Sequence, residues 1–272
     1  MVGQAKGLAM KLAQVLFSTN RPEYLSRTLE SQKFLDFTGC TVTKFFFDDF
    51  PLGRDDSQIT SLATDHGYTN VRLHEKNEGI GLTWREFWNL IRDDNYSYIW
   101  SQEDDVIILE PVIIKELIDF LNAVPAASQC VLKRQNWYPH EVPAAPLPTD
   151  IVMGQFRGEF SAAAYYFTPI ASLYPMRHVR FDYWKWYSEK YPNEPIWKTT
   201  NCNEAFVGKS LLEGFGLQSL HVKNRDGKNL IEHIGDYTQG RRLLIGEPGY
   251  PTFAKYDPEK RYDSRTGQEL SL

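Results

Sequence analysis

The sequence predicts an α/β protein built on one mixed, mostly parallel sheet flanked by helices. Apolar runs with strand character alternate with segments of helical periodicity in the first half of the chain, which is the pattern of βαβ units. Polar residues follow each strand-like run, as they do where a parallel sheet binds ligands at its carboxyl edge. The chain has 272 residues, of which 42% are hydrophobic and 24% charged. This length and composition suit one large globular domain.

The expected elements of the first half have local reasons. Pro22 stands where a helix would begin and Gly67 where one would end, because proline fits the first helical turn and glycine the position after the last. A further helix is expected to open on Pro111. The expected strands are 12–20, 40–51, 70–81 with its loop, and 96–105, and the expected helices are 21–34, 56–68, 82–94 and 111–124.

The second half is less regular, and no linker divides it from the first. A strand beginning at Cys130 is expected to run into a proline-rich loop that continues to 150. The other expected elements are a strand at 158–169, helices at 181–191 and 201–216, and a short strand with a turn at 227–240. We therefore expect a single domain over 1–272, ending in a polar C-terminal tail at 241–272.

Charge and cysteine content narrow the class of protein. The net charge of −5 gives no support to bulk electrostatic binding of nucleic acid, which usually needs a basic domain. The three cysteines, Cys40, Cys130 and Cys202, have neither metal-ligand spacing nor the even count of a disulfide framework. This favours reduced thiols in the cytoplasm, or in the host cytoplasm if the chain is viral. We recognise no signal peptide and no apolar stretch long enough to span a bilayer, so no membrane insertion is expected.

Three consecutive carboxylates, Glu103, Asp104 and Asp105, end the fourth expected strand. Like charges repel, so a positive group is expected beside them. Mg²⁺ and Mn²⁺ take oxygen ligands and commonly lie between one or two carboxylates and the phosphates of a substrate. The pattern favours a metal–diphosphate site, and the alternative is an acidic turn that only faces water.

Four motifs stand at the strand ends in chain order: STNRPEYLSRTLES, FFFDD, NEGIGLTWREFWNLI and EDDVIILEP. From about Val15 to about Gly240 the chain resembles the nucleotide-sugar glycosyltransferases with the A-type fold, of the family 2-like and N-acetylglucosaminyltransferase I-like kinds. The motifs are similar to that group's first strand–helix turn, second strand, Asn-x-Gly loop and Glu-Asp-Asp form of the Asp-x-Asp motif. The resemblance implies a Rossmann-like A-type fold, a nucleoside diphosphate sugar donor with a UDP-sugar favoured, and Mn²⁺ or Mg²⁺ as cofactor.

The resemblance also divides the expected domain and assigns its donor side. A nucleotide-sugar-binding half would cover about 12–125, and an acceptor-binding and catalytic half about 126–240. Asp105 is expected to bind the metal directly, Glu103 to contact metal-bound water or ribose, and Asp104 to contact the sugar or ribose. The other expected donor contacts are Thr19, Asn20, Arg21 and Asp48 at the base or ribose, Asn77 and Gly79 in the loop beside the base, and Arg85 at the diphosphate. Alternatively, Asp48 only caps the next turn and Arg85 only forms a surface salt bridge.

A transfer with inversion needs a carboxylate that accepts the proton of the acceptor hydroxyl. Glu204 is the candidate, because the resembled family places its base before a helix like NCNEAFVGKSLLEGFG, although the usual Glu-Asp pair reads Asn203-Glu204 here. Its alternative role is an acid favoured at a helix N-terminus by the macrodipole. His233 is expected as a further metal ligand, because many members use a late histidine, and His221 is the fallback. A lone histidine can equally be a packed or surface residue.

Aromatic residues indicate where an acceptor would bind. Trp137, Tyr138 and Trp184 are expected to stack on a sugar ring or an exposed base, with plain core packing as the alternative. The acceptor would be a glycan, a protein or a hydroxylated base in DNA, and the last would have to leave the base stack. Two other functions are considered: a nucleotidyltransferase, disfavoured because STNRPEY lacks a glycine-rich phosphate loop, and a non-catalytic nucleotide-sugar binding module, which would not need Glu204.

Overall fold

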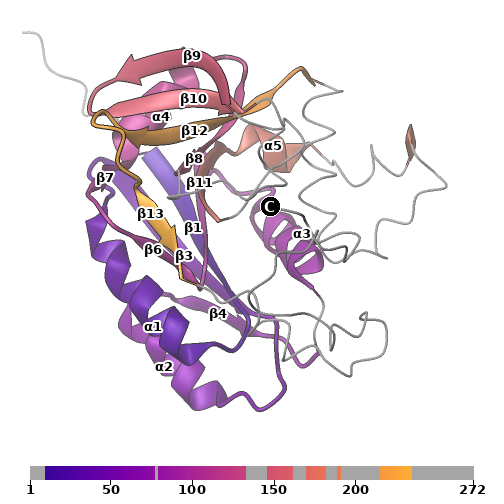
Figure 1. The fold of residues 1–272 in the computed structure, drawn as a ribbon. Coiled ribbons are helices and arrows are strands. Elements are labelled where there is room, and N and C mark those ends of the chain that lie inside the picture. Colours follow the sequence, from indigo (N-terminus) through magenta and orange to yellow (C-terminus); the bar gives the residue numbers. More distant parts are fainter. Residues whose placement is uncertain are drawn as a thin grey trace, which may run out of the picture.

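One large sheet forms the centre of the protein, seen in a computed structural model that describes residues 10–76, 79–132, 146–161, 170–181, 189–190 and 215–234. Its strands are β1 (Met10–Ser18), β3 (Cys40–Asp48), β4 (Asn70–Leu73), β5 (Tyr98–Glu103), β8 (Ala127–Leu132), β9 (Pro146–Met153), β10 (Phe156–Ser161), β11 (Ala171–Pro175) and β12 (Gln218–Asn224). They lie in the order β4-β3-β1-β5-β11-β8-β12-β10-β9 (Figure 1). Among these described strands, only β11 and β10 run against the others. The predicted mixed, mostly parallel sheet is confirmed.

Helices cover both faces of the sheet, which is why its central strands are buried on both sides (Figure 1). Alternate residues of β1 point to opposite faces, as the two-residue period of a strand requires. Leu16 packs with α1 (Pro22–Ser31) and α2 (Asp56–Asp65). Phe17 packs with α3 (Ile80–Ile91), and the short α5 (Arg177–Arg180) joins the same cluster. A third cluster joins α4 (Ile114–Ala123) to β8 and β12.

Two short accessory sheets tie later segments to the central one. β6 (Val106–Ile108) follows β5 directly and pairs antiparallel with β13 (Ile231–His233). β2 (Leu35–Asp36), which comes after the 3₁₀ turn η1 (Gln32–Phe34), pairs in parallel with β7 (Val112–Ile113). The first pairing brings a C-terminal segment next to the end of β5, and the site described below depends on it.

The structure corrects several sequence predictions, most of them in the second half of the chain. The helix expected to open on Pro111 begins at Ile114, because Val112 and Ile113 are held extended by their pairing with β2. The expected proline-rich loop gives way at Pro146 to β9, an edge strand, where proline is tolerated. Strands β11 and β12 were not predicted. The expected strand at 158–169 begins earlier, at Phe156, and the helices expected at 181–191 and 201–216 lie almost wholly outside the described residues.

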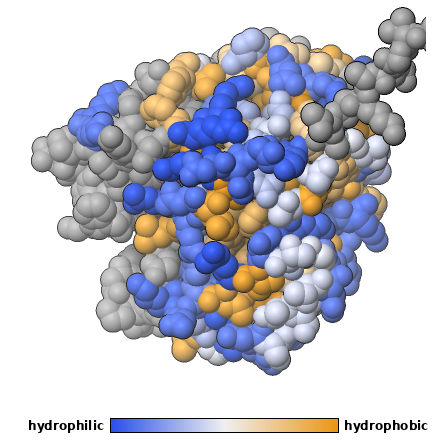
Figure 2. Space-filling view, turned by 180° about the vertical axis from the view of Figure 1, so that it is seen from behind, coloured by the Kyte–Doolittle hydropathy of each residue, from blue (hydrophilic) through white to orange (hydrophobic). Residues whose placement is uncertain are grey.

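The surface of the described residues mixes polar and apolar side chains. Seen from behind, hydrophilic residues cover much of the coloured face and break up smaller hydrophobic patches (Figure 2). Such interspersion is ordinary for a surface in contact with water. Within the described ranges, every helix falls short of the length and apolar character that a membrane crossing requires.

Candidate functional site: an acidic edge at the ends of four parallel strands

The carboxyl ends of β4, β3, β1 and β5 lie side by side, and the register aligns their polar residues. Ser18 at the end of β1 pairs with Asp48 at the end of β3, and Phe17 pairs with Glu103 at the end of β5. Because all four strands are parallel, the residues that follow them gather on one edge. This acidic edge holds five carboxylates in two groups, Asp48 with Asp49 and Glu103 with Asp104 and Asp105.

The turn after β1 connects both groups of acids through its backbone. The Thr19 N–H donates to Asp104 Oδ2 at 3.0 Å, and the Asn20 N–H donates to Asp48 Oδ2 at 2.7 Å. Asn20 has a φ of +56°, a left-handed conformation that asparagine adopts more readily than most residues. That conformation reverses the chain between β1 and α1. The short segment from Ser18 to Arg21 therefore fixes the positions of Asp48 and Asp104 relative to each other.

Arg21 supplies the positive charge expected beside the three acids. Its guanidinium pairs with both oxygens of Asp104, and its Nη1 lies 2.7 Å from Asp105 Oδ2. The side chains of Arg21, Asp104 and Asp105 are only 14%, 1% and 7% exposed. Burial lowers the pKa of Arg21, but the two carboxylates raise it by more, so its pKa lies above the ordinary value and the side chain stays charged.

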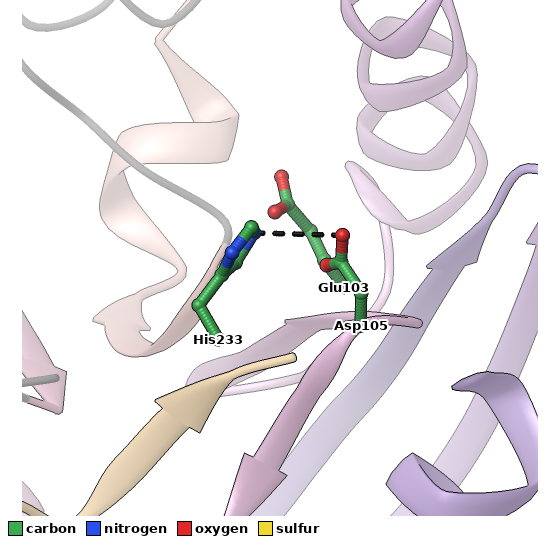
Figure 3. A group of neighbouring side chains, drawn as sticks. All are labelled: Glu103, Asp105 and His233. Carbon is green, nitrogen blue, oxygen red and sulfur yellow. Dashed lines mark ion pairs between the residues drawn. The ribbon is translucent and has the colours of Figure 1, made fainter. Parts of the chain in front are cut away.

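Three potential metal ligands converge next to the Arg21 guanidinium. One ligand atom each from Glu103, Asp105 and His233 lies within 4.8 Å of the other two. All three side chains point into the same space, where β5 and β13 end and β6 begins (Figure 3). His233 Nε2 is 3.4 Å from Asp105 Oδ2. Two carboxylates and an imidazole form a donor set that suits Mn²⁺ and is compatible with Mg²⁺.

The convergence depends on the short sheet of β6 and β13. His233 pairs with Val106 across that sheet, and the N–H of the next residue, Ile234, donates to the Asp105 backbone oxygen at 2.8 Å. Helix α1 supports the same turn from below, because Thr28 Oγ1 donates to the Asp104 backbone oxygen at 2.7 Å. A histidine far along the chain is therefore held beside the strand that carries the acids.

One carboxylate oxygen of this cluster is suited to bind a cation. Asp105 Oδ1 is buried and has no hydrogen-bond partner among the described residues, and the residue as a whole is only 5% exposed. A buried carboxylate oxygen without a partner is costly, and each such atom in a folded protein asks for an explanation. A divalent cation shared with Glu103 and His233 would satisfy it. The residues present therefore fit a bound metal ion.

The second acidic group is held by its own cations. Asp48 is fully buried and accepts from Arg54 Nη1 at 2.9 Å, in addition to Asn20. Asp49 lies 2.8 Å from His74 Nδ1 and accepts from the Gly79 N–H at 2.6 Å. These contacts fix the start of the loop after β4.

His74 bridges two carboxylates. Its Nε2 is 2.9 Å from Glu86 Oε2, so both ring nitrogens face an acid and the doubly protonated ring is favoured. The hydrogen bond with Asp49 raises the pKa of His74, and Glu86 adds to this effect, against a smaller opposing effect of burial. His74, Glu86 and Leu82 line a cavity of about 660 Å³ next to the loop.

Comparison with solved structures places this arrangement among known folds. The chain is similar to S. aureus TarS residues 1–349 in complex with UDP, with a TM-score of 0.52 and 13% identity over 87% of this chain and 64% of that one. It is also similar to the mannosyltransferase PcManGT from Pyrobaculum calidifontis in complex with GDP-Man and Mn²⁺, with a TM-score of 0.50 and 10% identity over 86% and 60%. No protein-family model and no curated protein matches the chain.

The chain has the A-type fold of nucleotide-sugar glycosyltransferases. It spans about 60 to 64% of the length of these neighbours. At 10 to 13% identity the likeness concerns the fold. In open α/β sheets, ligands generally bind outside the carboxyl ends of parallel strands, and the acidic edge lies at such strand ends.

The structure brings many of the predicted site residues together at this edge. Those placed there are Thr19, Asn20, Arg21, Asp48, Gly79, Glu103, Asp104, Asp105 and His233. Arg85 is exposed on α3, and His221, the fallback ligand, lies on β12. Asn77, Trp137, Tyr138, Trp184 and Glu204 lie outside the described residues. Their predicted roles stay predictions.

Sequence reasoning missed three partners at the acidic edge. Arg54 neutralises Asp48, and His74 bridges Asp49 and Glu86. Arg21, which was predicted as a contact of the nucleotide base or ribose, pairs with two of the acids. A signal for Arg21 was present in the sequence. It follows β1, and three adjacent acids at a neighbouring strand end demand a cation. Arg54 and His74 carry no comparable signal, because their contacts depend on how loops fold back over the edge.

Proposed function

We propose that the chain is a metal-dependent glycosyltransferase that moves a sugar from a nucleoside diphosphate sugar, with a UDP-sugar favoured, to a hydroxyl acceptor with inversion. One observation carries the proposal: ligand atoms of Glu103, Asp105 and His233 converge at the strand edge of this fold, and Asp105 has a buried oxygen without a hydrogen-bond partner among the described residues. The neighbours with this fold include complexes with UDP and with GDP-Man and Mn²⁺. These ligands support a nucleoside diphosphate donor and a divalent ion for this chain.

Geometry supports the proposed roles on the donor side, whereas the role of Glu204, which lies outside the described residues, rests on the sequence resemblance alone. Asp105 and His233 would hold the ion, and Glu103 would complete the site directly or through a bound water. A divalent ion there would neutralise the negative charge that grows on the departing diphosphate. The backbone turn at Thr19 and Asn20 and the loop that begins at His74 would border the nucleotide. Glu204 would accept the proton of the acceptor hydroxyl.

The first test measures coupled binding of nucleotide and metal. UDP and GDP, each with and without Mn²⁺, are added to the protein and its thermal unfolding is followed. We expect a nucleotide to stabilise the protein strongly only when Mn²⁺ is present, by about 2.7 kcal/mol at a hundred times its dissociation constant. Asp105→Asn should abolish this coupling, and Asp65→Asn, an exposed site on α2, should keep it. Equal stabilisation by nucleotide with and without metal would reject the metal-bridged donor site.

The second test separates an enzyme from a binding module. UDP-sugars are incubated with the protein, and released UDP is measured with and without candidate glycan, protein or hydroxylated-DNA acceptors. Glu204→Gln should keep the nucleotide-dependent stabilisation and lower turnover by about 10²- to 10⁴-fold. Turnover unchanged in Glu204→Gln would contradict the assignment of the base. Binding without turnover in the wild type under all acceptors would favour a binding module, and release of pyrophosphate from a nucleoside triphosphate would favour a nucleotidyltransferase.

A further inference from the structure

Asp104 is fully occupied by the protein itself. Its Oδ2 accepts from Ser18 Oγ at 3.1 Å, from the Thr19 N–H at 3.0 Å and from Arg21 Nε at 3.3 Å, and its Oδ1 accepts from Arg21 Nη2. The backbone and guanidinium partners can only donate, so the carboxylate is ionised as it accepts. The side chain of Asp104 is 1% exposed, and both of its oxygens are engaged by the protein.

Asp105 is held differently, although it is the next residue. Arg21 Nη1 donates to its Oδ2 at 2.7 Å, and in the described part of the chain its Oδ1 has no hydrogen-bond partner. One guanidinium therefore faces two carboxylates but saturates only one of them. Arg21 is itself fixed, because it precedes Pro22 at the start of α1 and its guanidinium lies 5.6 Å from the centre of the Tyr24 ring.

The charges of the acid group around Arg21 add up to a simple value. Among the described residues, the carboxylates of Glu103, Asp104 and Asp105 and the guanidinium of Arg21 sum to a net charge of −2. His233 adds nothing when it binds a metal as a neutral imidazole. A doubly charged cation then brings the cluster to neutrality.

We infer that Arg21 is a counter-ion built into the site. It pairs with Asp104 and so leaves the second oxygen of Asp105 to bind the metal. It also sets the net charge of the site to match a divalent cation. This inference rests on the proposed metal site and extends it with a residue that determines metal affinity and charge preference. It differs from the sequence prediction, which placed Arg21 at the nucleotide base. Arg21 acts through the carboxylates, so it is a positioning residue.

The test compares metal binding in the absence of nucleotide and sugar. Mn²⁺ affinity is measured by electron paramagnetic resonance, and Tb³⁺ affinity by luminescence, for the wild type, Arg21→Gln, Asp104→Asn, the double variant of both, and Arg21→Lys. Removing the positive charge of Arg21 should raise Mn²⁺ affinity about tenfold, which is the effect of a unit charge on a divalent ion across ~6 Å at the dielectric constant of water. Tb³⁺ affinity should rise about threefold more than Mn²⁺ affinity, because its charge is larger.

The double variant distinguishes a counter-ion from a ligand. Asp104→Asn alone should weaken Mn²⁺ binding about tenfold, because Arg21 is then only partly compensated. Adding Arg21→Gln to it restores the net charge of −2 and should return the affinity to within about threefold of the wild type. If Asp104 were instead a direct ligand, the double variant would stay weak, and the inference would be wrong. Arg21→Lys keeps the charge and should stay near the wild type.

The outcomes also separate this inference from the proposed function. Arg21→Gln leaves a buried carboxylate without its cation, so circular dichroism is recorded first. If that variant does not fold, the comparison of Asp104→Asn with the double variant still decides, because it contains the same removal of Arg21. If Asp105→Ala abolishes metal binding but the Arg21 variants bind like the wild type, the counter-ion role of Arg21 would be wrong and the metal site would stand. A wild type that binds neither Mn²⁺ nor Tb³⁺ would overturn the metal site as well.

Discussion

Asn20 illustrates how one residue conformation organises the acidic edge. Its left-handed backbone lets the N–H groups of Thr19 and Asn20 reach acids at the ends of two different strands, and its Nδ2 donates to the Leu52 oxygen at 2.9 Å. Strain of this kind is found at functional sites when the surroundings impose it. The conformation is therefore expected to matter more than the side-chain hydrogen bond, which is exposed.

Substitution of Asn20 separates these two contributions. Asn20→Gly removes the side chain but fits the positive φ, whereas Asn20→Val also places a β-branched residue in a conformation that costs about 1–2 kcal/mol. We expect Asn20→Val to lose about 1 kcal/mol or more of unfolding free energy beyond Asn20→Gly, measured by urea denaturation. Equal losses in the two variants would show that the backbone conformation carries no strain.

His74 makes a prediction about pH. Its pKa is raised above the ordinary 6.5 by Asp49 first and by Glu86 as well. A raised folded pKa gives stability that is fully present below pH 6.5 and is lost as pH rises through the folded value. We therefore expect the stability difference between the wild type and His74→Gln to be largest near pH 5.5–6 and to shrink towards pH 8.5. Urea denaturation across this range measures it, and a difference that grows with pH would contradict the assignment.

Single residues also mark how far the sequence could be interpreted. The acids Asp48, Asp104 and Asp105 were predictable as a group because they follow apolar strands, and parallel strands place their ends on one edge. The sequence did not predict which of these acids pairs with a cation of the protein itself. That outcome depends on a guanidinium geometry and on a loop contact from Arg54, and neither leaves a periodic pattern in the sequence.

At the scale of elements, the first half was largely predictable and the second only in part, for a physical reason. Helices α1, α2 and α3 have strong local signals: Pro22 at the start of α1, Asp55 capping α2 through the Ser57 and Gln58 N–H groups, and an aromatic stripe on α3. β11 and β12 lack such signals, because their partners come from distant parts of the chain. β7 forms only through pairing with β2, which overrides the helical pattern after Pro111.

The support of β6 by α1 gives a prediction at this scale. Ser31 Oγ accepts the Ile108 N–H at 3.0 Å, and both residues are buried. Ser31→Ala removes this acceptor and should lower the unfolding free energy by about 1–3 kcal/mol, because the buried N–H loses its partner. Ser61→Ala, on the exposed face of α2, is the control and should change stability by less than about 0.5 kcal/mol. Matching effects in the two variants would mean that the Ile108 N–H finds another acceptor.

On the scale of the whole molecule, the candidate metal site joins two segments that are far apart in the sequence. Glu103 and Asp105 come from the first half of the chain, and His233 comes from the C-terminal strand β13. The local pairing of β13 with β6 is short, with three residue pairs. A short antiparallel pair is only marginally stable by itself, so a bound ion would add a second connection between these segments.

Hydrogen exchange followed by mass spectrometry tests that connection. The Ile234 N–H donates to the Asp105 oxygen, so its exchange reports the opening of β13 away from the acids. Because an ion that binds only the closed arrangement stabilises it by mass action, saturating Mn²⁺ at a hundred times its dissociation constant should slow exchange in peptides covering β13 by about 100-fold. His233→Ala should remove most of this slowing, while peptides from α2 should exchange alike with and without Mn²⁺. Slowing that persists in His233→Ala would show that the ion stabilises β13 without this side chain and would contradict the assignment of His233 as its ligand.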